Sequence, residues 1–271
     1  AIIDDHSLNN PKFIKVKNVL KSLQDLSKFH RSKLLKTKII ALTGSNGKTT
    51  TKELISKVLK KKYKIISTIG NLNNHIGVPL TLLRIKSDTE IAIVEMGANH
   101  LNEIKFLTEL VNPDFGLITN FGKAHLEGFG NLQGVIKGKS ELYDFLISNN
   151  KTAYINNDDE IQKNYKGKKI SFGISKDSDF KFKEILNGMY SAIKFKDQII
   201  DSKLIGDYNF NNIAFATLIG LHFNVGIEKI QKVISSYIPS NNRSQIIEKN
   251  NKLIILDAYN ANPTSMISAI N

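Results

Sequence analysis

The stretch from Lys38 to Glu53, which reads KIIALTGSNGKTTTKE, constrains the fold of this chain more than any other. Its apolar, β-branched beginning predicts a buried strand over 39–42. From Lys48 onward apolar residues recur at helical spacing, and a glycine-containing loop lies between the two elements. A strand, a glycine loop and a helix start in this order form a phosphate cradle, because the loop amides and the positive end of the helix face the anion.

Two side chains after the loop carry the chemistry that a bound nucleotide requires. Lys48 would place a positive charge on the terminal phosphates, and the Thr49 hydroxyl would bind Mg²⁺. The loop differs from the common GxxxxGK[ST] pattern, because Leu42 stands where that pattern has its first glycine. An ordinary glycine turn, with Lys48 as a solvated charge, is the alternative. The order of strand, loop and helix favours the nucleotide site.

Two further candidates follow predicted strands. Glu95 ends the apolar run 91–94, and the carboxyl end of a strand beside a phosphate loop is where such folds place a metal-binding acid. A helix-capping or surface acid is the alternative. His125 follows the predicted strand 115–119, so we expect it at the same edge of the sheet, within reach of Mg²⁺ or phosphate. A structural histidine is the alternative there.

An amide-rich loop, between the second predicted strand and a helix that begins near Pro79, is a candidate for substrate binding. Its sequence, GNLNNHIG, starts at Gly70 and contains Asn71, Asn73 and Asn74. Asparagine side chains both donate and accept hydrogen bonds, which suits a sugar, peptide or phosphate ligand. Turn formation alone also favours Asn and Gly, for reasons of backbone geometry. The sequence leaves these two interpretations open.

The order of the predicted elements indicates the fold class. Short apolar strands alternate with helices, which predicts an α/β fold with a P-loop-type, mostly parallel sheet flanked by helices. These strands are expected at 39–42, 64–68, 91–94, 115–119 and 152–155. Between Lys168 and Leu204, short alternating segments and the turn signal at Asn187 predict a small antiparallel β insert that begins with 169–173 and packs beside the main sheet. We also expect helices over 18–31, 209–223 and 227–237, a strand over 1–5, and a hairpin or two strands over 245–257.

Composition excludes several classes of function. The chain has no cysteine, so disulfides and thiolate chemistry are excluded. No apolar run approaches the length of a membrane span, and we expect a cytoplasmic protein without a membrane partner. The net charge of +13 could attract nucleic acid. The lysines are scattered, however, without a basic stripe interleaved with aromatics, so we expect no nucleic-acid partner and keep a nucleic-acid-stimulated P-loop ATPase as the weaker alternative.

A series of segments resembles, in the same order, those of the Mur ligases and the related folylpolyglutamate synthases. These segments are TGSNGKTTTKE, GNLNNHIGVPLTLL, VEMGAN, AHLEGFG, KGKSEL, NNDD and DAYNANPTSM. The resemblance covers nearly the whole chain from about Val16 onward. NLNN-IGVP and YNANP-SM favour the branch of the family that adds D-alanyl-D-alanine to UDP-N-acetylmuramoyl-tripeptide. Another Mur-type amino-acid ligase, or a folylpolyglutamate synthase, is the alternative.

The resemblance implies an ATP-dependent amide synthesis through an acyl phosphate, with ATP and Mg²⁺ as cofactors. Such chemistry depends on alignment and charge neutralisation more than on covalent help. In this reading Thr49 and Glu95 bind one Mg²⁺, and His125 joins a second. Family members carry a carbamylated lysine that helps to hold the second metal, and the KGKSEL segment aligns it with Lys139 rather than Lys137. The substrates would be the UDP-N-acetylmuramoyl-tripeptide and D-alanyl-D-alanine.

The resemblance also implies which residues contact ATP. They lie in the phosphate loop and in later segments, namely Gly44, Ser45, Asn46, Gly47, Lys48, Thr49, Thr50, Asn156, Asn209, Asn212, Arg243 and Asp257. Tyr208 stands where the family carries a histidine near the adenine, and Leu256 where many members carry a second Asp. The asparagine loop would face the muramyl-peptide.

Three regions are expected from the resemblance. Residues 1–36 would be the remnant of an amino-terminal domain that binds the UDP end of the substrate, followed by a linker helix. Residues 37–239 would form the central ATP-binding domain, and 240–271 the start of a carboxyl-terminal domain that closes over ATP. We therefore expect little or no turnover from this fragment alone, and we expect it to be a monomer.

Overall fold

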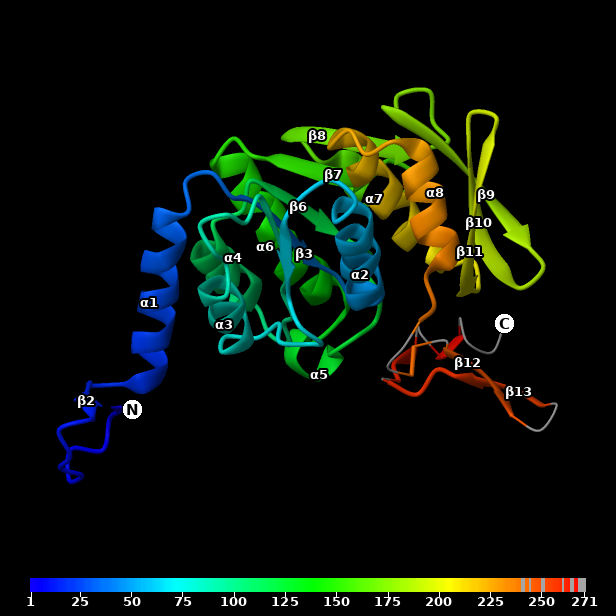
Figure 1. Ribbon diagram of the computed structural model, residues 1–271. Helices are drawn as coiled ribbons and strands as arrows, with labels where there is room; N and C mark the ends of the chain where they lie inside the picture. Colours follow the sequence, from blue (N-terminus) through cyan, green and yellow to red (C-terminus); the bar gives the residue numbers. More distant parts are fainter. Residues whose placement is uncertain (240–241, 244, 250–251, 260, 264–265, 268–271) are drawn as a thin grey trace.

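One large sheet organises the structure (Figure 1). The structure is a computed structural model, which describes residues 1–239, 242–243, 245–249, 252–259, 261–263 and 266–267. The sheet has nine strands in the order β11-β10-β9-β8-β7-β6-β3-β5-β4. Their bounds are β3 Lys38–Thr43, β4 Ile65–Ser67, β5 Ile91–Glu95, β6 Phe115–Ile118, β7 Thr152–Asn156, β8 Lys168–Gly173, β9 Phe180–Asn187, β10 Tyr190–Phe195 and β11 Gln198–Ile205.

Most of this sheet is parallel. Along the sheet from β4 to β9 each adjacent pair of strands is parallel, whereas β10 pairs antiparallel with both β9 and β11. The expected α/β class, with a mostly parallel sheet and a small antiparallel part, is confirmed. Alternate residues of β3 enter the apolar cores on the two faces: Ile40 and Leu42 on one, Ile39 and Ala41 on the other. A strand that is buried on both faces in this way reads as a continuous apolar run.

Helices cover both faces of the sheet. α2, α7 and α8 pack on one face, α3, α4 and α6 on the other, and α1 packs outside α3 and α4 (Figure 1). The helices are α1 Val19–Lys33, α2 Lys48–Leu59, α3 Gly77–Leu83, α4 Glu103–Val111, α5 Leu126–Phe129, α6 Leu132–Ser148, α7 Asn209–His222 and α8 Ile227–Ser236. None of the helices in the described part of the chain combines the length and apolarity needed to cross a membrane.

The antiparallel part is smaller than the sequence suggested. The prediction that 169–173 begins the insert is wrong, because these residues belong to β8, which pairs in parallel with β7. The preceding segment 157–167 contains the 3₁₀ helix Gln162–Asn164 and carries the chain back to the starting edge, as a parallel pair requires. The insert also continues the main sheet rather than packing beside it, since Phe172 of β8 pairs with Phe180 of β9.

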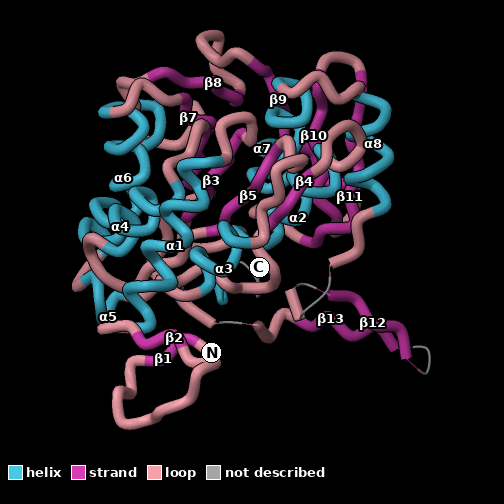
Figure 2. Tube along the Cα trace, turned by 60° about the vertical axis from the view of Figure 1, so that its left-hand side comes forward, coloured by secondary structure: helices cyan, strands magenta, loops and turns pink. Residues whose placement is uncertain are grey.

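The expected strand over 1–5 is shorter in the structure. β1 (Ile2–Ile3) pairs in parallel with β2 (Ile14–Lys15). Asp4 leaves the strand because its carboxylate accepts a hydrogen bond from the Val19 amide, at the start of α1, at 3.0 Å. These short strands lie at one side of the molecule, and the expected hairpin, formed by β12 (Gln245–Lys249) and β13 (Lys252–Leu256), lies at the other (Figure 2).

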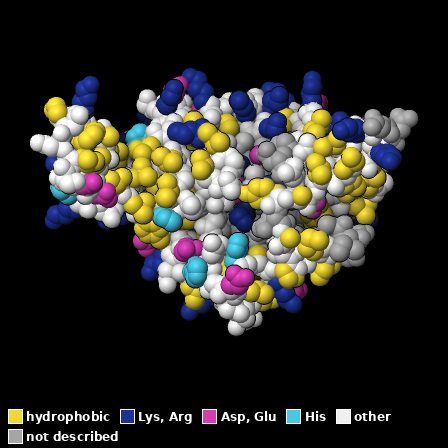
Figure 3. Space-filling view, turned by 90° about the horizontal axis from the view of Figure 1, so that it is seen from below, with side chains coloured by type: hydrophobic (Ala, Val, Ile, Leu, Met, Phe, Trp, Pro, Cys, Tyr) yellow, Lys and Arg dark blue, Asp and Glu magenta, His cyan; other side chains and the backbone are white. Residues whose placement is uncertain are grey.

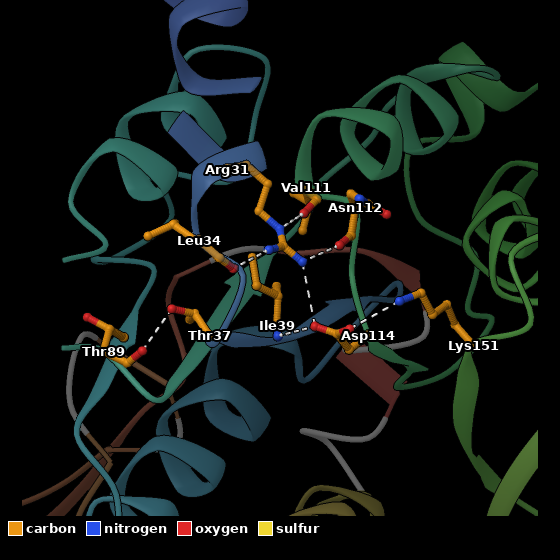
Figure 4. Close-up of polar contacts among 9 residues, drawn as sticks. All are labelled: Arg31, Leu34, Thr37, Ile39, Thr89, Val111, Asn112, Asp114 and Lys151. Atoms are coloured by element: carbon orange, nitrogen blue, oxygen red, sulfur yellow. Dashed lines mark hydrogen bonds and ion pairs between the residues drawn. The ribbon is translucent and has the colours of Figure 1, made fainter. Parts of the chain in front are cut away.

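α1 is anchored at its carboxyl end by Arg31, whose side chain is 11% exposed (Figure 4). The guanidinium donates hydrogen bonds to the carbonyls of Leu34 at 3.1 Å, Val111 at 3.0 Å and Asn112 at 2.8 Å. It also lies 3.5 Å from the Asp114 carboxylate. A planar group with several donors satisfies carbonyls from more than one segment at once.

Asp114 joins this anchor to the sheet. Its Oδ2 accepts from the Ile39 amide at 3.0 Å, and its Oδ1 from the Lys151 ammonium at 3.1 Å (Figure 4). Ile39 lies near the start of β3, and Asp114 immediately precedes β6. The network therefore fixes α1 to the amino ends of the central strands, at the edge of the sheet opposite the phosphate loop.

Replacing Arg31 should destabilise the protein measurably. Arg31→Met removes charge-assisted hydrogen bonds to carbonyl groups, so it should lower the free energy of unfolding by about 2 kcal/mol. Arg31→Lys should recover only part of this, because an ammonium lacks the planar fork. Arg84→Met is the matched control, because this exposed guanidinium donates a longer, solvent-exposed hydrogen bond to the Ser67 carbonyl at 3.3 Å, and it should stay within about 0.5 kcal/mol of the unaltered protein. Urea unfolding followed by circular dichroism measures all three, and equal losses for Arg31→Met and Arg84→Met would contradict the anchoring role.

Candidate active site

The loop between β3 and α2 has the backbone geometry of an anion cradle. Gly47 precedes α2 with a φ of 76°, and no side chain caps the helix start. The backbone amides of the first turn and the positive end of the helix dipole are therefore left without a side-chain partner at the helix start, where an anion can bind them. Gly44 has a φ of 145°, and a Cβ there would lie 1.9 Å from the Thr119 hydroxyl. Glycine is required at both positions.

Residues that follow β6 hold this loop in place. Thr119 donates its hydroxyl proton to the Asn46 carbonyl at 2.6 Å. The Asn120 side chain accepts from the Asn46 amide and donates to the Asn46 carbonyl, each at 3.0 Å. The Ser45 hydroxyl donates to the Gly122 carbonyl at 2.8 Å. Because β3 and β6 are neighbours in the sheet, the loop takes its shape from a segment distant in the sequence.

Lys48 lies half-buried against its own loop. Its ammonium donates to the carbonyls of Gly44 at 2.7 Å and Ser45 at 3.0 Å. Burial lowers the pKa of Lys48, the Glu95 carboxylate raises it, and the Arg243 guanidinium lowers it. An anion carrying several negative charges would offset both the burial and the repulsion between the two cations.

Glu95 ends β5, is only 1% exposed, and faces the first turns of α2. Its Oε1 accepts from the Thr49 hydroxyl at 3.2 Å and from the Asn73 side-chain amide at 2.8 Å. Its Oε2 makes no hydrogen bond within the described chain and lies 3.5 Å from the Lys52 ammonium. The Thr49 hydroxyl and the Glu95 carboxylate provide hard oxygen donors of the kind that Mg²⁺ prefers.

Magnesium fits this pair only together with other oxygen ligands. Across the residues that the structure describes, no group of three or more His, Asp or Glu side chains could hold a metal ion. Mg²⁺ is commonly held by one or two carboxylates together with substrate phosphates and water. The Thr49–Glu95 pair therefore suits a metal shared with a bound phosphate, and not one held by the protein alone.

A cavity of about 970 Å³ brings most of the predicted residues together. Figure 3, which views the molecule from below, shows a hollow near the middle of this face with a basic side chain inside it. The predicted residues that line the cavity are Ser45, Asn46, Gly47, Lys48, Thr49, Thr50, Asn71, Asn73, Asn74, Glu95, His125, Asn209, Asn212, Arg243 and Asp257. Gly44, Lys139 and Asn156 are not among the residues that line the cavity. Thr49, Glu95 and His125 thus share one edge of the sheet, as the sequence argument required.

Burial and nearby positive charge favour the uncharged forms of His125 and Lys139, because both lower the pKa of each residue. Burial lowers the pKa of His125, and the ammonium groups of Lys48 and Lys139 lower it further. A neutral imidazole is the form that binds metal. Lys139 in α6 is 1% exposed, and its ammonium lies 5.3 Å from the centre of the Phe129 ring. Burial, followed by repulsion from Lys48, lowers the pKa of Lys139 to about 7, so much of this amine is neutral near pH 7.

Asn209 and Asn212, expected near the adenine, use their side-chain amides to bind other protein groups. Asn212 accepts from the Thr51 hydroxyl at 2.8 Å and donates to Asn209 at 2.7 Å. Asn209 donates to the Ile205 carbonyl at 2.7 Å. The Asn212 oxygen would also lie 2.4 Å from a Cβ on Gly47. Both asparagines therefore support the phosphate loop, and their contact with adenine stays a prediction.

Asn156 contacts Asn211, one of the residues that line the cavity. Its side chain donates to Asn211 at 3.0 Å and accepts from the Asp158 amide at 2.9 Å. Asn211 and Tyr208 both line the cavity. Asn156 therefore positions a lining residue, and a direct contact between Asn156 and a nucleotide stays a prediction.

The asparagine loop shows the turn chemistry that was one of the two interpretations left open by the sequence. The Asn74 side chain accepts from the amides of Ile76 at 3.1 Å and Gly77 at 2.9 Å, which is turn chemistry at the start of α3. Asn73 donates to the strand-end carboxylate, as described above. Asn71, Asn73 and Asn74 all line the cavity, so binding of a substrate by this loop stays a prediction.

The carboxyl-terminal segment reaches the same cavity. The Arg243 guanidinium stacks on the Tyr259 ring, with 3.5 Å between its central carbon and the ring centre. Its Nε is buried without a hydrogen-bond partner among the described residues. Asn262 donates to the Asn46 side chain at 2.8 Å, and Asp257 lines the cavity. This segment therefore contacts the phosphate loop directly.

Several residues that complete the site were missed by the sequence argument. Thr119 and Asn120 could have been found as the first residues after a central strand. Lys52 follows Lys48 at i+4, a spacing that places both lysines on one face of α2. Asn262 lies in the YNANP segment that carries the family resemblance, but its contact with the phosphate loop could not be found from the sequence because the two segments are far apart in the chain.

Comparison with known proteins agrees with this geometry. The family model described as the Mur ligase middle domain matches residues 42–220. In an alignment 278 residues long, the chain is 36% identical to a UDP-N-acetylmuramoyl-tripeptide–D-alanyl-D-alanine ligase of Bacillus subtilis (strain 168). That match covers 100% of this chain and 61% of the relative, so the chain spans less than two thirds of that protein's length.

Solved structures are similar as well. A crystal structure of MurF from Acinetobacter baumannii matches with a TM-score of 0.85 at 30% identity, covering 99% of this chain and 61% of that one. MurF ligase from Thermotoga maritima, in complex with ADP, matches with a TM-score of 0.82 at 26% identity, covering 99% and 64% of the two chains. Since the middle-domain model extends over well more than half of the sequence and includes the phosphate loop, Glu95 and His125, this chain belongs to the Mur ligase family.

Proposed function

We propose that this chain is the ATP-binding core of a ligase that joins D-alanyl-D-alanine to UDP-N-acetylmuramoyl-tripeptide in the synthesis of peptidoglycan precursors. The observation that carries the proposal is the 3.2 Å contact between the Thr49 hydroxyl and the Glu95 carboxylate, in a cavity shared with the phosphate and asparagine loops. The two substrates are inferred from the names of the relatives. The ADP in the T. maritima relative supports a nucleotide in this cavity.

The reaction requires two substrates to be aligned and their charge to be neutralised. A carboxylate oxygen of the peptide attacks the γ-phosphorus of ATP, giving an acyl phosphate and ADP. The amine of D-alanyl-D-alanine then attacks the acyl carbon, loses a proton and expels phosphate. The loop amides and Lys48 would bind the β- and γ-phosphates and stabilise the charge that develops there. The contact between Asn262 and Asn46 would bring the carboxyl-terminal segment over the nucleotide.

Magnesium belongs to this proposal. Thr49 and Glu95 would hold one Mg²⁺, and His125 together with a carbamylated Lys139 would hold a second. When bound, these ions neutralise phosphate charge and orient the reacting oxygens. The lowered pKa values of His125 and Lys139 support these roles, because a neutral imidazole binds metal and a neutral amine reacts with CO₂.

The remaining expectations complete the proposal. Residues 37–239 would form the central domain, and the matched range 42–220 lies inside these limits. Residues 1–36 and 240–271 would belong to its neighbours. The ATP-binding and substrate-binding assignments given above, a cytoplasmic location, a monomeric state and the absence of membrane and nucleic-acid partners stay predictions.

The substrate assignment can be tested in the protein at its full natural length. Phosphate release in the presence of ATP, Mg²⁺ and UDP-N-acetylmuramoyl-tripeptide should depend on D-alanyl-D-alanine. Release that depends instead on a single amino acid, or on glutamate with a folate, would assign the chain to a sister ligase. Release stimulated by nucleic acid with a steep salt dependence would favour the ATPase alternative.

Lys48→Ala and Glu95→Ala should each lower the rate of ligation by about 10²-fold or more. Each removes a charged group that would neutralise the transferring phosphoryl group or hold its metal. Glu109→Ala, at an exposed position of α4, is the control and should leave the rate unchanged. The measurement is D-alanyl-D-alanine-dependent phosphate release, with thermal melting in parallel. Unfolding of either variant would show that the residue is structural.

Ligation should also depend on carbon dioxide and pH through Lys139. Carbamate formation consumes the neutral amine and releases a proton, so it is favoured above the pKa of about 7 and lost below it. In air-equilibrated buffer the rate should fall as the pH drops through 7. Removal of CO₂ should lower the rate at higher pH as well, and bicarbonate should restore it. With ¹³C-bicarbonate, NMR should show a carbamate carbon that Lys139→Gln lacks and that Lys137→Gln, at an exposed position, retains. A signal that persists in Lys139→Gln would exclude this lysine.

A further inference from the structure

Lys52 is a buried cation to which neither the sequence argument nor the proposed mechanism gives a role. It lies in α2, one turn after Lys48, and is only 2% exposed. It does not line the cavity, so its ammonium does not compete for the phosphates. Burying the charged end of a lysine side chain is unfavourable unless the charge is compensated. The contacts of its ammonium therefore indicate its role.

One of these contacts is to the metal-binding carboxylate. The Lys52 ammonium lies 3.5 Å from Glu95 Oε2, the oxygen without a hydrogen bond, whereas Oε1 accepts from Thr49 and Asn73. Lys52 thus compensates the charge of Glu95 at the oxygen that Thr49 does not contact. Protein groups that hold a metal-binding carboxylate in this way fix its orientation and tune its affinity for the ion.

The second contact is to the asparagine loop. The Lys52 ammonium donates to the Gly70 carbonyl at 2.8 Å. Farther along the same loop, Asn73 donates to Glu95 at 2.8 Å, and its carbonyl accepts from the Gly97 amide at 2.8 Å. A Cβ on Gly97 would lie 2.7 Å from the Asn73 side-chain oxygen, so loop and strand end are in close contact. The loop expected to face the substrate is therefore attached at two points to the acid expected to bind the metal.

We infer that Lys52 is a positioning residue, which orients Glu95 toward the metal shared with ATP and couples that carboxylate to the asparagine loop. This inference rests on the proposed function, because it requires a metal-bound nucleotide beside Glu95. It follows that the affinity for Mg²⁺ and the affinity for the muramyl-peptide both depend on a side chain that touches neither ligand. Binding of the peptide to the loop would stabilise the Lys52–Gly70 contact and thereby the carboxylate.

The test compares Lys52→Met with Lys57→Met, an exposed lysine of the same helix. The readout is the Mg²⁺ concentration that half-saturates binding of a non-hydrolysable ATP analogue, followed calorimetrically. Lys52→Met should raise this concentration by about 10- to 100-fold, as loss of such outer partners commonly does. Binding of the analogue without Mg²⁺ should stay unchanged. Lys52→Arg, which keeps the charge, should recover part of the loss, and Lys57→Met should match the unaltered protein.

A second variant covers the case in which Lys52→Met does not fold. Asn73→Ala leaves the ion pair in place and removes only the second attachment of the loop, so it should shift the Mg²⁺ requirement in the same direction by a smaller factor. In the ligase assay, Lys52→Met at saturating Mg²⁺ should recover most of its kcat while KM for the muramyl-peptide stays raised. A purely structural lysine would lower kcat, and Mg²⁺ would not restore it.

The possible outcomes separate this inference from the proposed function. If the unaltered protein binds the analogue in a Mg²⁺-dependent way but releases no phosphate with D-alanyl-D-alanine, the substrate assignment fails. The comparison of Lys52→Met with Lys57→Met still tests the role of Lys52 in that case. If Lys52→Met shows the same Mg²⁺ requirement as Lys57→Met, the inference is overturned. A nucleotide that binds without any dependence on Mg²⁺ would overturn it as well.

Discussion

The site depends on one buried carboxylate. Glu95 is almost inaccessible to solvent, and an uncompensated charge in that position would cost several kcal/mol. Its compensation comes from Thr49 and Lys52 on α2 and from Asn73 on the loop before α3. These three side chains therefore have to converge on the end of β5. The position of the phosphate loop relative to the asparagine loop follows from this convergence, and so does the shape of the cavity between them.

The positive charge around the cavity favours the binding of a polyanion. The Arg243 guanidinium lowers the pKa of Lys48, and Lys48 lowers the pKa values of Lys139 and His125. Mutual repulsion of this kind is relieved when phosphate groups enter between the cations. The strongly basic composition, with a net charge of +13, would add a long-range attraction for anionic substrates.

The sequence predicted the parts of the structure that depend on local signals. The alternation of apolar strands with helices identified the fold class, and the position of Glu95 and His125 after their strands placed both at the correct edge. Parallel strands all end at one edge, so this inference needed no knowledge of which strands are neighbours. The two-sided burial of 39–42 followed from its unbroken apolar run.

What the sequence did not reveal depends on pairing between distant segments. The alternating pattern of 169–173 suits either orientation, and only its pairing with β7 makes it parallel. The asparagines of α7 matched a family motif for adenine, yet Asn212 packs beneath Gly47 and bonds to Thr51. A side chain with both a donor and an acceptor satisfies a ligand or the protein equally well, so residue type alone does not decide between them.

The anchoring of α1 has a mechanical consequence. Arg31 fixes one end of this helix to the amino edge of the sheet, whereas Gln24, nearer its other end, donates to the His75 carbonyl at 3.1 Å and forms part of the cavity wall. α1 also packs against α3 and α4, so Arg31 is not its only attachment to the rest of the molecule. The helix therefore couples the amino edge of the sheet, which it contacts through Arg31, to the asparagine loop, which it contacts through Gln24.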